Sequence, residues 1–437
     1  MLIFACIAAT IIAFIEVSSF LHKGDRSRGG LSYPFAFALL LALVGYTYYL
    51  SLVASIPYPF VLAGLVVVPG IALALYAVRH HDRSLSLPTF ERPGRVLLLL
   101  VGLLAATLPF NKQIYRWGDW DAWAIWNLHA KYLFYPEYWT NLFTNKLVKT
   151  HPDYPLMLPS LVAYMWRGVE TATPLAPMIL AHLVYFAIPV TVFLGLTRFN
   201  YVFPAIVALC VFALDTKFIE IARSQYSDTL LAFFILIAFV MYKEAQHGID
   251  RRLFFLLGFI AGSTTWIKNE GALFFLTFSF AVLCFHFRNF RTILHYAAGA
   301  LIPFLILVHF KVVYAPANDL IHAGRGTDLL DLIGNPDRYG LIITYFFRTG
   351  FMYYSVILVL LTLLLVKKIA FVKSLPMLVV GLLLSGYFVI YLTTPNDLEW
   401  HLSQSIERLF HHIYPACLYL LLLKISTQSP GFKTVTI

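Results

Sequence analysis

Apolar stretches long enough to cross a lipid bilayer recur along the whole chain, and they constrain its fold more than any other feature. The stretches 33–55 and 375–393 contain no charged residue and run for about 20 residues, the length that a membrane-spanning α-helix needs. A membrane β-strand would instead be about 10 residues of alternating polarity. With 60% hydrophobic and 12% charged residues, the chain has too little polar surface for a water-soluble globule. The sequence therefore predicts an all-α polytopic membrane protein.

A bilayer-length window predicts about 13 transmembrane helices. They lie near 2–21, 33–55, 58–78, 95–110, 174–196, 201–215, 229–243, 253–267, 271–287, 293–313, 340–366, 375–393 and 408–424. The first lacks a basic n-region and a small-residue cleavage site, so we expect a retained span rather than a signal peptide.

The charged residues between these stretches predict the topology. Basic residues recur in every second connection, which is typical of cytoplasmic loops. They are Lys23, Arg26 and Arg28; Arg79, Arg83, Arg92 and Arg95; Lys243, Arg251 and Arg252; Arg288 and Arg291; and Lys367, Lys368 and Lys373. The long connections 111–173, 215–228, 314–339 and 394–407 then face the other, extracytoplasmic side. The net charge of +10 is thereby explained by topology, and we expect no nucleic-acid partner.

We expect a single membrane domain with three parts. Residues 1–94 hold three N-terminal spans, 95–290 form a core with a large first extracytoplasmic loop, 111–173, and 291–437 supply the C-terminal spans and outer loops. The loop is expected to contain helices that lie at the membrane interface.

Two carboxylates lie among tryptophans in this first outer loop. Nothing breaks a helix between Trp120 and Phe134, and Asp119 is suited to cap its start, while Asp121 falls in its first turn. An oriented, ionised carboxylate can serve as a general base for a sugar acceptor. Trp123 and its neighbours are either aromatic residues of the membrane interface or a platform for a sugar ring or prenyl chain. His129 and Lys131, further along this helix, are expected to face solvent or lipid headgroups.

These residues resemble the GT-C glycosyltransferases that use polyprenyl-phosphate sugars, especially the protein mannosyltransferase and lipid A aminoarabinose transferase branch (family 39-like). Asp121-Ala-Trp-Ala-Ile-Trp126 is similar to that family's carboxylate motif in the first outer loop, which implies that Asp121 is the catalytic base. The family's second acidic position is Ala122 here, so Asp119 stays open as the base. The family's motif usually follows the first span, whereas here three spans precede the equivalent span, 95–110.

Three further elements follow in the order that the family shows, within 95–290. His151-Pro-Asp-Tyr-Pro-Leu156 is similar to an element near the lipid phosphate, Gln225-Tyr-Ser-Asp-Thr-Leu230 to an aromatic-small-Asp element opening a span, and Lys268-Asn-Glu-Gly271 to a lysine-acid-glycine turn. The resemblance implies His151, Asp228, Lys268 and Glu270 as substrate-binding residues. Asp153, beside His151, is either part of an acid-base pair or a turn-stabilising residue.

Cations are needed for the phosphate of a lipid-linked sugar, because the leaving phosphate gains charge. Lys268 and Arg408 are the candidates, the alternatives being snorkelling for Lys268 and an ion pair with Glu407, Asp397 or Glu399 for Arg408. His401 lies near Arg408 and is a further binding candidate. His401, His411 and His412 lack a ligand spacing typical of metal sites, so we expect neither metal nor other cofactor.

The sequence thus predicts an inverting glycosyltransferase that moves a sugar from a polyprenyl phosphate to an extracytoplasmic acceptor. We expect it in a bacterial inner membrane, with its active site on the extracytoplasmic side. The alternatives are a multispan transporter or flippase of a lipid-linked or small anionic substrate, and a non-enzymatic factor of envelope assembly. Motifs of soluble enzymes, such as a phosphate loop or a dinucleotide fingerprint, are missing from the sequence.

Overall fold

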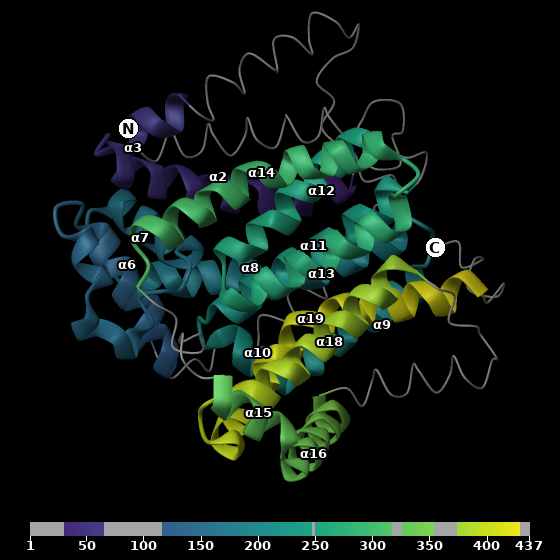
Figure 1. The fold of residues 1–437 in the computed structure, drawn as a ribbon. Helices are drawn as coiled ribbons and strands as arrows, with labels where there is room; N and C mark the ends of the chain where they lie inside the picture. Colours follow the sequence, from purple (N-terminus) through teal and green to yellow (C-terminus); the bar gives the residue numbers. More distant parts are fainter. Residues whose placement is uncertain (1–29, 65–115, 247–249, 317–325, 354–373, 429–437) are drawn as a thin grey trace, which may run out of the picture.

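The computed structural model describes residues 30–64, 116–246, 250–316, 326–353 and 374–428, and every regular element in these ranges is helical (Figure 1). The elements are α2 (Ser32–Ala54), α3 (Tyr58–Leu62), η4 (Ala122–Trp126), α6 (Asn127–Phe134), η5 (Trp139–Phe143), η6 (Asn145–Thr150), α7 (Met157–Val169), α8 (Leu175–Thr197), α9 (Val202–Leu214), α10 (Thr216–Arg223), α11 (Ser227–Ala245), α12 (Arg251–Ser263), η7 (Thr264–Trp266), α13 (Asn269–His286), α14 (Phe290–Val313), α15 (Gly326–Gly334), α16 (Pro336–Tyr353), α18 (Leu375–Thr393) and α19 (Leu398–Gln428).

Six helices of the described residues are long and apolar enough to cross a membrane, namely α2, α8, α13, α14, α18 and α19. A seventh span results if α9 and α10, which meet at 64°, are counted as one broken helix. The chain therefore has the build of a helical membrane protein. The predicted spans 2–21 and 95–110 lie outside the described residues. The predicted spans 58–78 and 340–366 are described only in part. The total of 13 stays a prediction.

Helix α11 forms the centre of the bundle (Figure 1). Its residues from Leu230 to Tyr242 are all buried, and it packs against α8, α12 and α19. A helix that is apolar on every side must be covered by other helices or lipid, and here protein covers it. The first turn of α11, with Asp228, is thereby held at one end of a rigid core.

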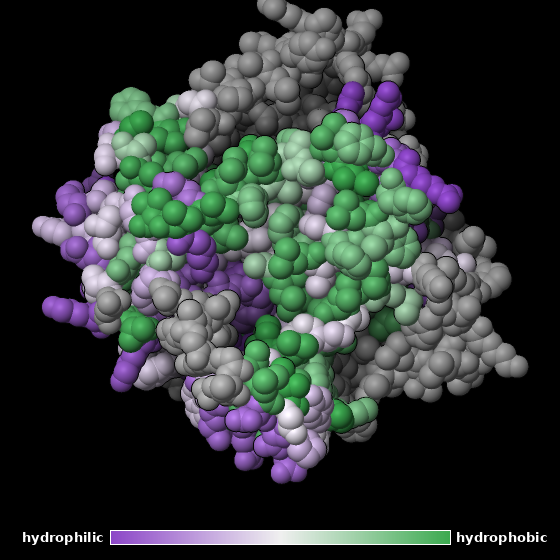
Figure 2. All heavy atoms as spheres, in the orientation of Figure 1, coloured by the Kyte–Doolittle hydropathy of each residue, from purple (hydrophilic) through white to green (hydrophobic). Residues whose placement is uncertain are grey.

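The outer helices present apolar side chains to their surroundings. Leu276 and Phe280 of α13 and Leu301, Phe304 and Leu305 of α14 are exposed. Figure 2 shows hydrophobic side chains across the middle of this face and hydrophilic ones at the end that carries α6 and α7, and again at the opposite end. An apolar band between two polar rims is the surface that a bilayer requires.

Helix α19 begins ten residues before the predicted span 408–424. Residues 398–407, expected in an extracytoplasmic connection, are helical, so the helix begins earlier than the predicted span. The cause is a cap: Oδ1 of Asp397 accepts a hydrogen bond from the backbone N–H of Trp400 at 2.8 Å. The 31 residues of α19 are about 46 Å long, whereas a hydrocarbon core is about 30 Å thick. The first turns of α19 therefore extend beyond the apolar band.

Candidate active site

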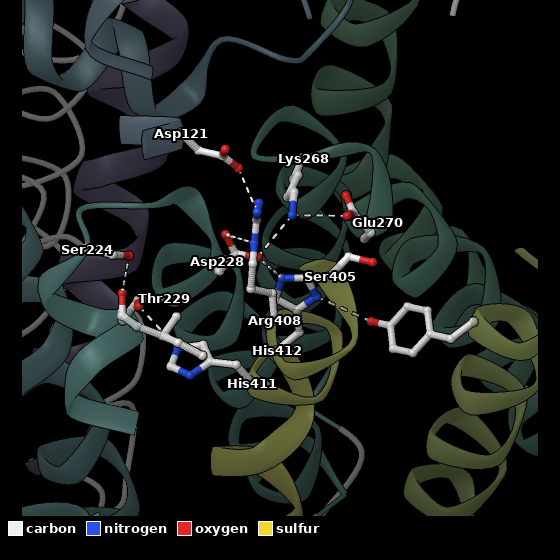
Figure 3. Close-up of polar contacts among 12 residues, drawn as sticks. Asp121, Ser224, Asp228, Thr229, Lys268, Glu270, Ser405, Arg408, His411 and His412 are labelled. Carbon is white, nitrogen blue, oxygen red and sulfur yellow. Dashed lines mark hydrogen bonds and ion pairs between the residues drawn. The ribbon is translucent and has the colours of Figure 1, made fainter. Parts of the chain in front are cut away.

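Six ionisable side chains meet at the end of the bundle where α11 and α13 begin (Figure 3). They are Asp121, Asp228, Lys268, Glu270, Arg408 and His412, and we call them the ion cluster. Five of the six were predicted as site residues from the sequence; His412 was not.

Asp228 is the centre of the ion cluster. Its Oδ1 accepts hydrogen bonds from Nζ of Lys268 at 3.0 Å and from Nε2 of His412 at 2.8 Å. Its Oδ2 lies 3.4 Å from Nε of Arg408. The side chain of Asp228 is 0% exposed, and a carboxylate so far from water requires such partners to remain charged.

The other two carboxylates are more accessible. Oδ2 of Asp121 lies 2.6 Å from Nη1 of Arg408, and Oε1 of Glu270 lies 3.0 Å from Nζ of Lys268. Their side chains are 20% and 21% exposed. Lys268 is 3% exposed and Arg408 is 19% exposed, so a ligand approaching the cluster meets Asp121, Arg408 and Glu270 before Lys268.

A close contact between two distant segments positions Asp121. Gly118 has φ +77°, and a Cβ there would collide with the carbonyl oxygen of Ser224. The N–H of Asp119 donates to the same carbonyl at 3.1 Å, and Nε2 of Gln225 donates to the carbonyl of Arg116 at 3.1 Å. The start of the helix that carries Asp121 is thus fixed beside the chain that leads into Asp228.

Asp119 lies outside the ion cluster and acts at the helix start. Its Oδ1 accepts the N–H of Trp120 at 2.7 Å, and its carbonyl accepts the N–H of Ala122 at 2.9 Å. The predicted helix from Trp120 to Phe134 is present, with one feature that the sequence analysis missed. Residues Ala122–Trp126 form the π-helical turn η4, a distortion that is common at functional sites.

Lys268 and Glu270 are placed by the tight turn between η7 and α13. A Cβ on Gly271 would collide with the carbonyl oxygen of Thr264, so glycine permits this turn to close. Lys268 has extended backbone angles and precedes the helix, whereas Glu270 lies in its first turn. The turn thereby brings the side chains of Lys268 and Glu270 together, 3.0 Å apart between Nζ and Oε1.

Arg408 and His412 lie one helical turn apart on α19, and both face Asp228. The alternative partners Glu407, Asp397 and Glu399 suggested for Arg408 were wrong, because the guanidinium is paired with Asp121 and Asp228. Cζ of Arg408 also lies 4.9 Å from the ring centroid of Tyr226. The i, i+4 spacing of Arg408 and His412 is the signal that could have identified His412.

His411 belongs to a different contact. Its Nε2 lies 3.1 Å from Oγ1 of Thr229, and its ring stacks on Phe218 at 4.6 Å between centroids. Among the described residues, no group of three or more His, Cys, Asp and Glu side chains could hold a metal ion.

Asp153 lies in a second ion pair beside the ion cluster. Nζ of Lys311 is 3.9 Å from Oδ2 of Asp153 and donates to its carbonyl at 2.6 Å. Asn269 contacts both residues. Its Nδ2 donates a hydrogen bond to Oδ2 of Asp153 at 3.3 Å, and its Oδ1 accepts one from Nζ of Lys311 at 3.2 Å. Asp153 is buried, which fits a structural role that holds the loop to α13 and α14.

His151 and Tyr154 connect that loop to the ion cluster. His151 has φ +51° and stacks on Tyr154, which in turn stacks on the buried Trp126. Burial raises the pKa of Tyr154 well above its usual range, and the carboxylates of Glu270, Asp153 and Asp121 raise it further. Tyr154 is therefore a neutral hydroxyl group beside the cluster's carboxylates.

Two predicted binding residues lie at other positions. The ring of His401 contacts Tyr391, and its Nδ1 lies 2.9 Å from Oγ1 of Thr394. Trp123 is 49% exposed and packs edge-to-face with Trp120. It is accessible to a ligand, as the platform prediction needs.

His129 is fully buried, and the expectation that it faces solvent was wrong. Its Nε2 lies 2.8 Å from the carbonyl oxygen of Thr150. The helix α6, which carries His129, packs against α7. Lys131 is exposed as expected.

A small apolar pocket opens next to the ion cluster, between α6, α7, α8, α10 and α11. Its walls include Val162, Leu180, Val184 and Leu230, and Tyr226 separates it from Arg408. The arrangement therefore combines a charged site with apolar walls at one rim of the bundle.

Comparisons with known proteins give no match to a family model, to a curated protein or to a solved structure.

Proposed function

We propose that this chain is an inverting glycosyltransferase of the GT-C type, which moves a sugar from a polyprenyl phosphate to an acceptor on the extracytoplasmic side. The observation that carries this proposal is the pairing of the partly exposed Asp121 with Arg408 beside an apolar pocket. A potential base and a phosphate-binding cation then adjoin one another, with apolar side chains nearby. The order of the motifs in 95–290 supports the same reading.

In the proposed reaction, Asp121 accepts the proton of an acceptor hydroxyl group. The hydroxyl oxygen attacks the anomeric carbon of the sugar, and the bond from that carbon to the phosphate oxygen breaks. Polyprenyl phosphate leaves with the electrons of this bond, and the configuration at the anomeric carbon inverts. Arg408 stabilises the charge that develops on the phosphate.

The buried members of the cluster hold the reacting groups in place. Lys268 is 3% exposed and already has two carboxylate partners, Asp228 and Glu270. We therefore assign Lys268 mainly to fixing Asp228 and Glu270, and Arg408 to the phosphate, since the guanidinium is the more accessible cation. Asp119 is assigned to the helix start.

The topology that we propose with this function has about 13 spans in a bacterial inner membrane. It places the ion cluster on the extracytoplasmic side. In support, the connections α11–α12 and α13–α14, at the other end of the bundle, carry exposed arginines: Arg251, Arg252, Arg288 and Arg291.

A multispan transporter or flippase is the second candidate. It is favoured by the burial of Asp228, Lys268 and His412, because ionisable groups inside a bundle often mark a path for an ion or a proton. Such a path would have to reach the other side, whereas a transferase needs access from lipid and from one aqueous side only.

Labelled polyprenyl-phosphate sugars incubated with membranes that contain the protein test the proposal. We expect label to pass to an acceptor with the wild type and not with Asp121→Asn. Vesicles that accumulate the substrate without any sugar transfer would instead support the transporter.

A further inference from the structure

We infer that Arg408 holds Asp121 in an unreactive ion pair, and that the phosphate of the donor frees Asp121 by taking its place on Arg408. This inference rests on the proposed function. It couples the binding of the donor to the activation of the base, through a single exchange of partners.

The contact between the two residues is short but uses little of the guanidinium. One nitrogen, Nη1, bonds to one oxygen, Oδ2 of Asp121, at 2.6 Å. Nε of Arg408 is buried without a hydrogen-bond partner, and it lies 3.4 Å from Oδ2 of Asp228, which also has none. A guanidinium carries five N–H donors in a planar fork, which suits two oxygens of one phosphate. A phosphate can therefore offer Arg408 a more complete contact than Asp121 does.

Of the two carboxylates on Arg408, Asp121 is the one that can leave. Asp228 is 0% exposed and is held by Lys268 and His412 as well. Asp121 is 20% exposed and is bonded to Arg408 through one oxygen. It also sits at the start of a helix, just before the wide turn η4, whereas Asp228 lies in the rigid core helix.

Geometry explains why the exchange changes reactivity. Oδ2 of Asp121 accepts a hydrogen bond from Nη1 of Arg408 at 2.6 Å, so this oxygen faces the guanidinium and not an acceptor hydroxyl group. It becomes available to the proton of that hydroxyl group when the guanidinium turns to phosphate. One anion replaces another on Arg408, so the cation is never left unpaired in the partly buried site.

The test measures the affinity of free polyprenyl phosphate, which has no sugar, for the detergent-solubilised full chain. If Asp121 competes with phosphate for Arg408, Asp121→Asn should tighten binding by about tenfold, since the competing charge is lost. Asp119→Asn is the matched control, because it makes the same chemical change two residues away outside the ion cluster, and it should leave the affinity within about twofold. Arg408→Ala should weaken binding, and Asp121→Asn should give no gain in that background.

Equal or weaker binding by Asp121→Asn would overturn the inference, as would an equal gain from Asp119→Asn, which would assign the effect to net charge. Thermal unfolding of each variant identifies a folding defect, and Asp121→Ser then serves as the second neutral substitution. If the wild type transfers sugar but Asp121→Asn binds polyprenyl phosphate no more tightly, the exchange of partners on Arg408 is refuted and the proposed function stands. If Asp121→Asn binds polyprenyl phosphate more tightly but the wild type transfers no sugar, the exchange stands and the proposed function is refuted.

Discussion

His412 donates a hydrogen bond from Nε2 to the carboxylate of Asp228 at 2.8 Å, although 184 positions separate them in the chain. Both side chains are 0% exposed. The bond joins α19 to α11, the two helices that carry most of the ion cluster's buried part. The same hydrogen bond therefore holds α19 against α11 and positions Asp228 in the ion cluster.

Asp228→Asn should be the most destabilising substitution in the cluster. It leaves Lys268 buried with only Glu270 as a charged partner, and loss of one member of a buried ion pair costs about 3–5 kcal/mol. Thermal unfolding in detergent measures this. Glu270→Gln, which changes a carboxylate that is 21% exposed, should lower the melting temperature less. Equal losses would mean that Asp228 is not the centre of the cluster.

Asp121→Asn should reduce sugar transfer by about 100- to 10,000-fold, the usual effect of losing a general base. The protein should still insert and unfold as the wild type does, because Asp121 is partly exposed. Asp119→Asn should cost about 1 kcal/mol of helix stability and keep most of the activity. Initial rates of sugar transfer from a labelled donor, measured for both variants, show which of the two aspartates is the base. Activity that survives Asp121→Asn and disappears with Asp119→Asn would reverse the two roles.

Single cysteines should report opposite sides of the membrane at the two ends of the bundle. In a background free of native cysteines, Lys146→Cys and Gln404→Cys should react with an impermeant thiol reagent in intact cells. Arg288→Cys, at the turn between α13 and α14, should react only after the membrane is opened. The reverse pattern would place the ion cluster in the cytoplasm and exclude an extracytoplasmic acceptor.

Acid should weaken the packing of α6 through His129. Burial lowers the pKa of His129 to about 3, whereas an exposed histidine titrates near 6.5. Between these values the unfolded state binds a proton that the folded state excludes, so stability falls as the pH is lowered. The loss is about 1.4 kcal/mol at about pH 5.5. His129→Gln removes this titration, so its melting temperature should change less than that of the wild type from about pH 7.5 to about pH 5.5. If the melting temperatures of the wild type and of His129→Gln change equally with pH, the role of His129 is contradicted.

Hydropathy predicted the apolar helices well because burial in lipid and burial in protein both demand continuous apolar residues. The stretches 174–196 and 375–393 differ from α8 and α18 by at most one residue at either end. Hydropathy did not predict the first turns of α19, because they mix polar and apolar residues and lie beyond the apolar band. A capping signal at Asp397 marks that helix start, and hydropathy does not detect it.

Of the predicted site residues, Asp121, Asp228, Lys268, Glu270 and Arg408 meet in the ion cluster, whereas Asp119, Asp153, His151, His401 and Trp123 lie outside it. Asp228, Lys268 and Glu270 were predicted from the resemblance of their motifs to a known family. The pairing of Arg408 with Asp121 depends on how α19 packs against α11 and on the contact between Asp119 and Ser224, and residues 287 positions apart share no local pattern. His412 was missed because it stands with His401 and His411 at no spacing typical of a metal site, whereas the spacing that links it to the site is the i, i+4 step from Arg408.

The wide turn η4 changes how sequences of this kind should be aligned. A π-helical turn accommodates one residue more than an α-helical turn, and η4 lies between Asp121 and the regular helix α6. In a regular α-helix of the same sequence, Asp121 would be rotated by about 100° relative to Leu133, the angle that one residue contributes. A chain that lacks one residue between Asp121 and Asn127 can therefore present its carboxylate to the same arginine. Motif searches based on this segment should allow a one-residue gap there.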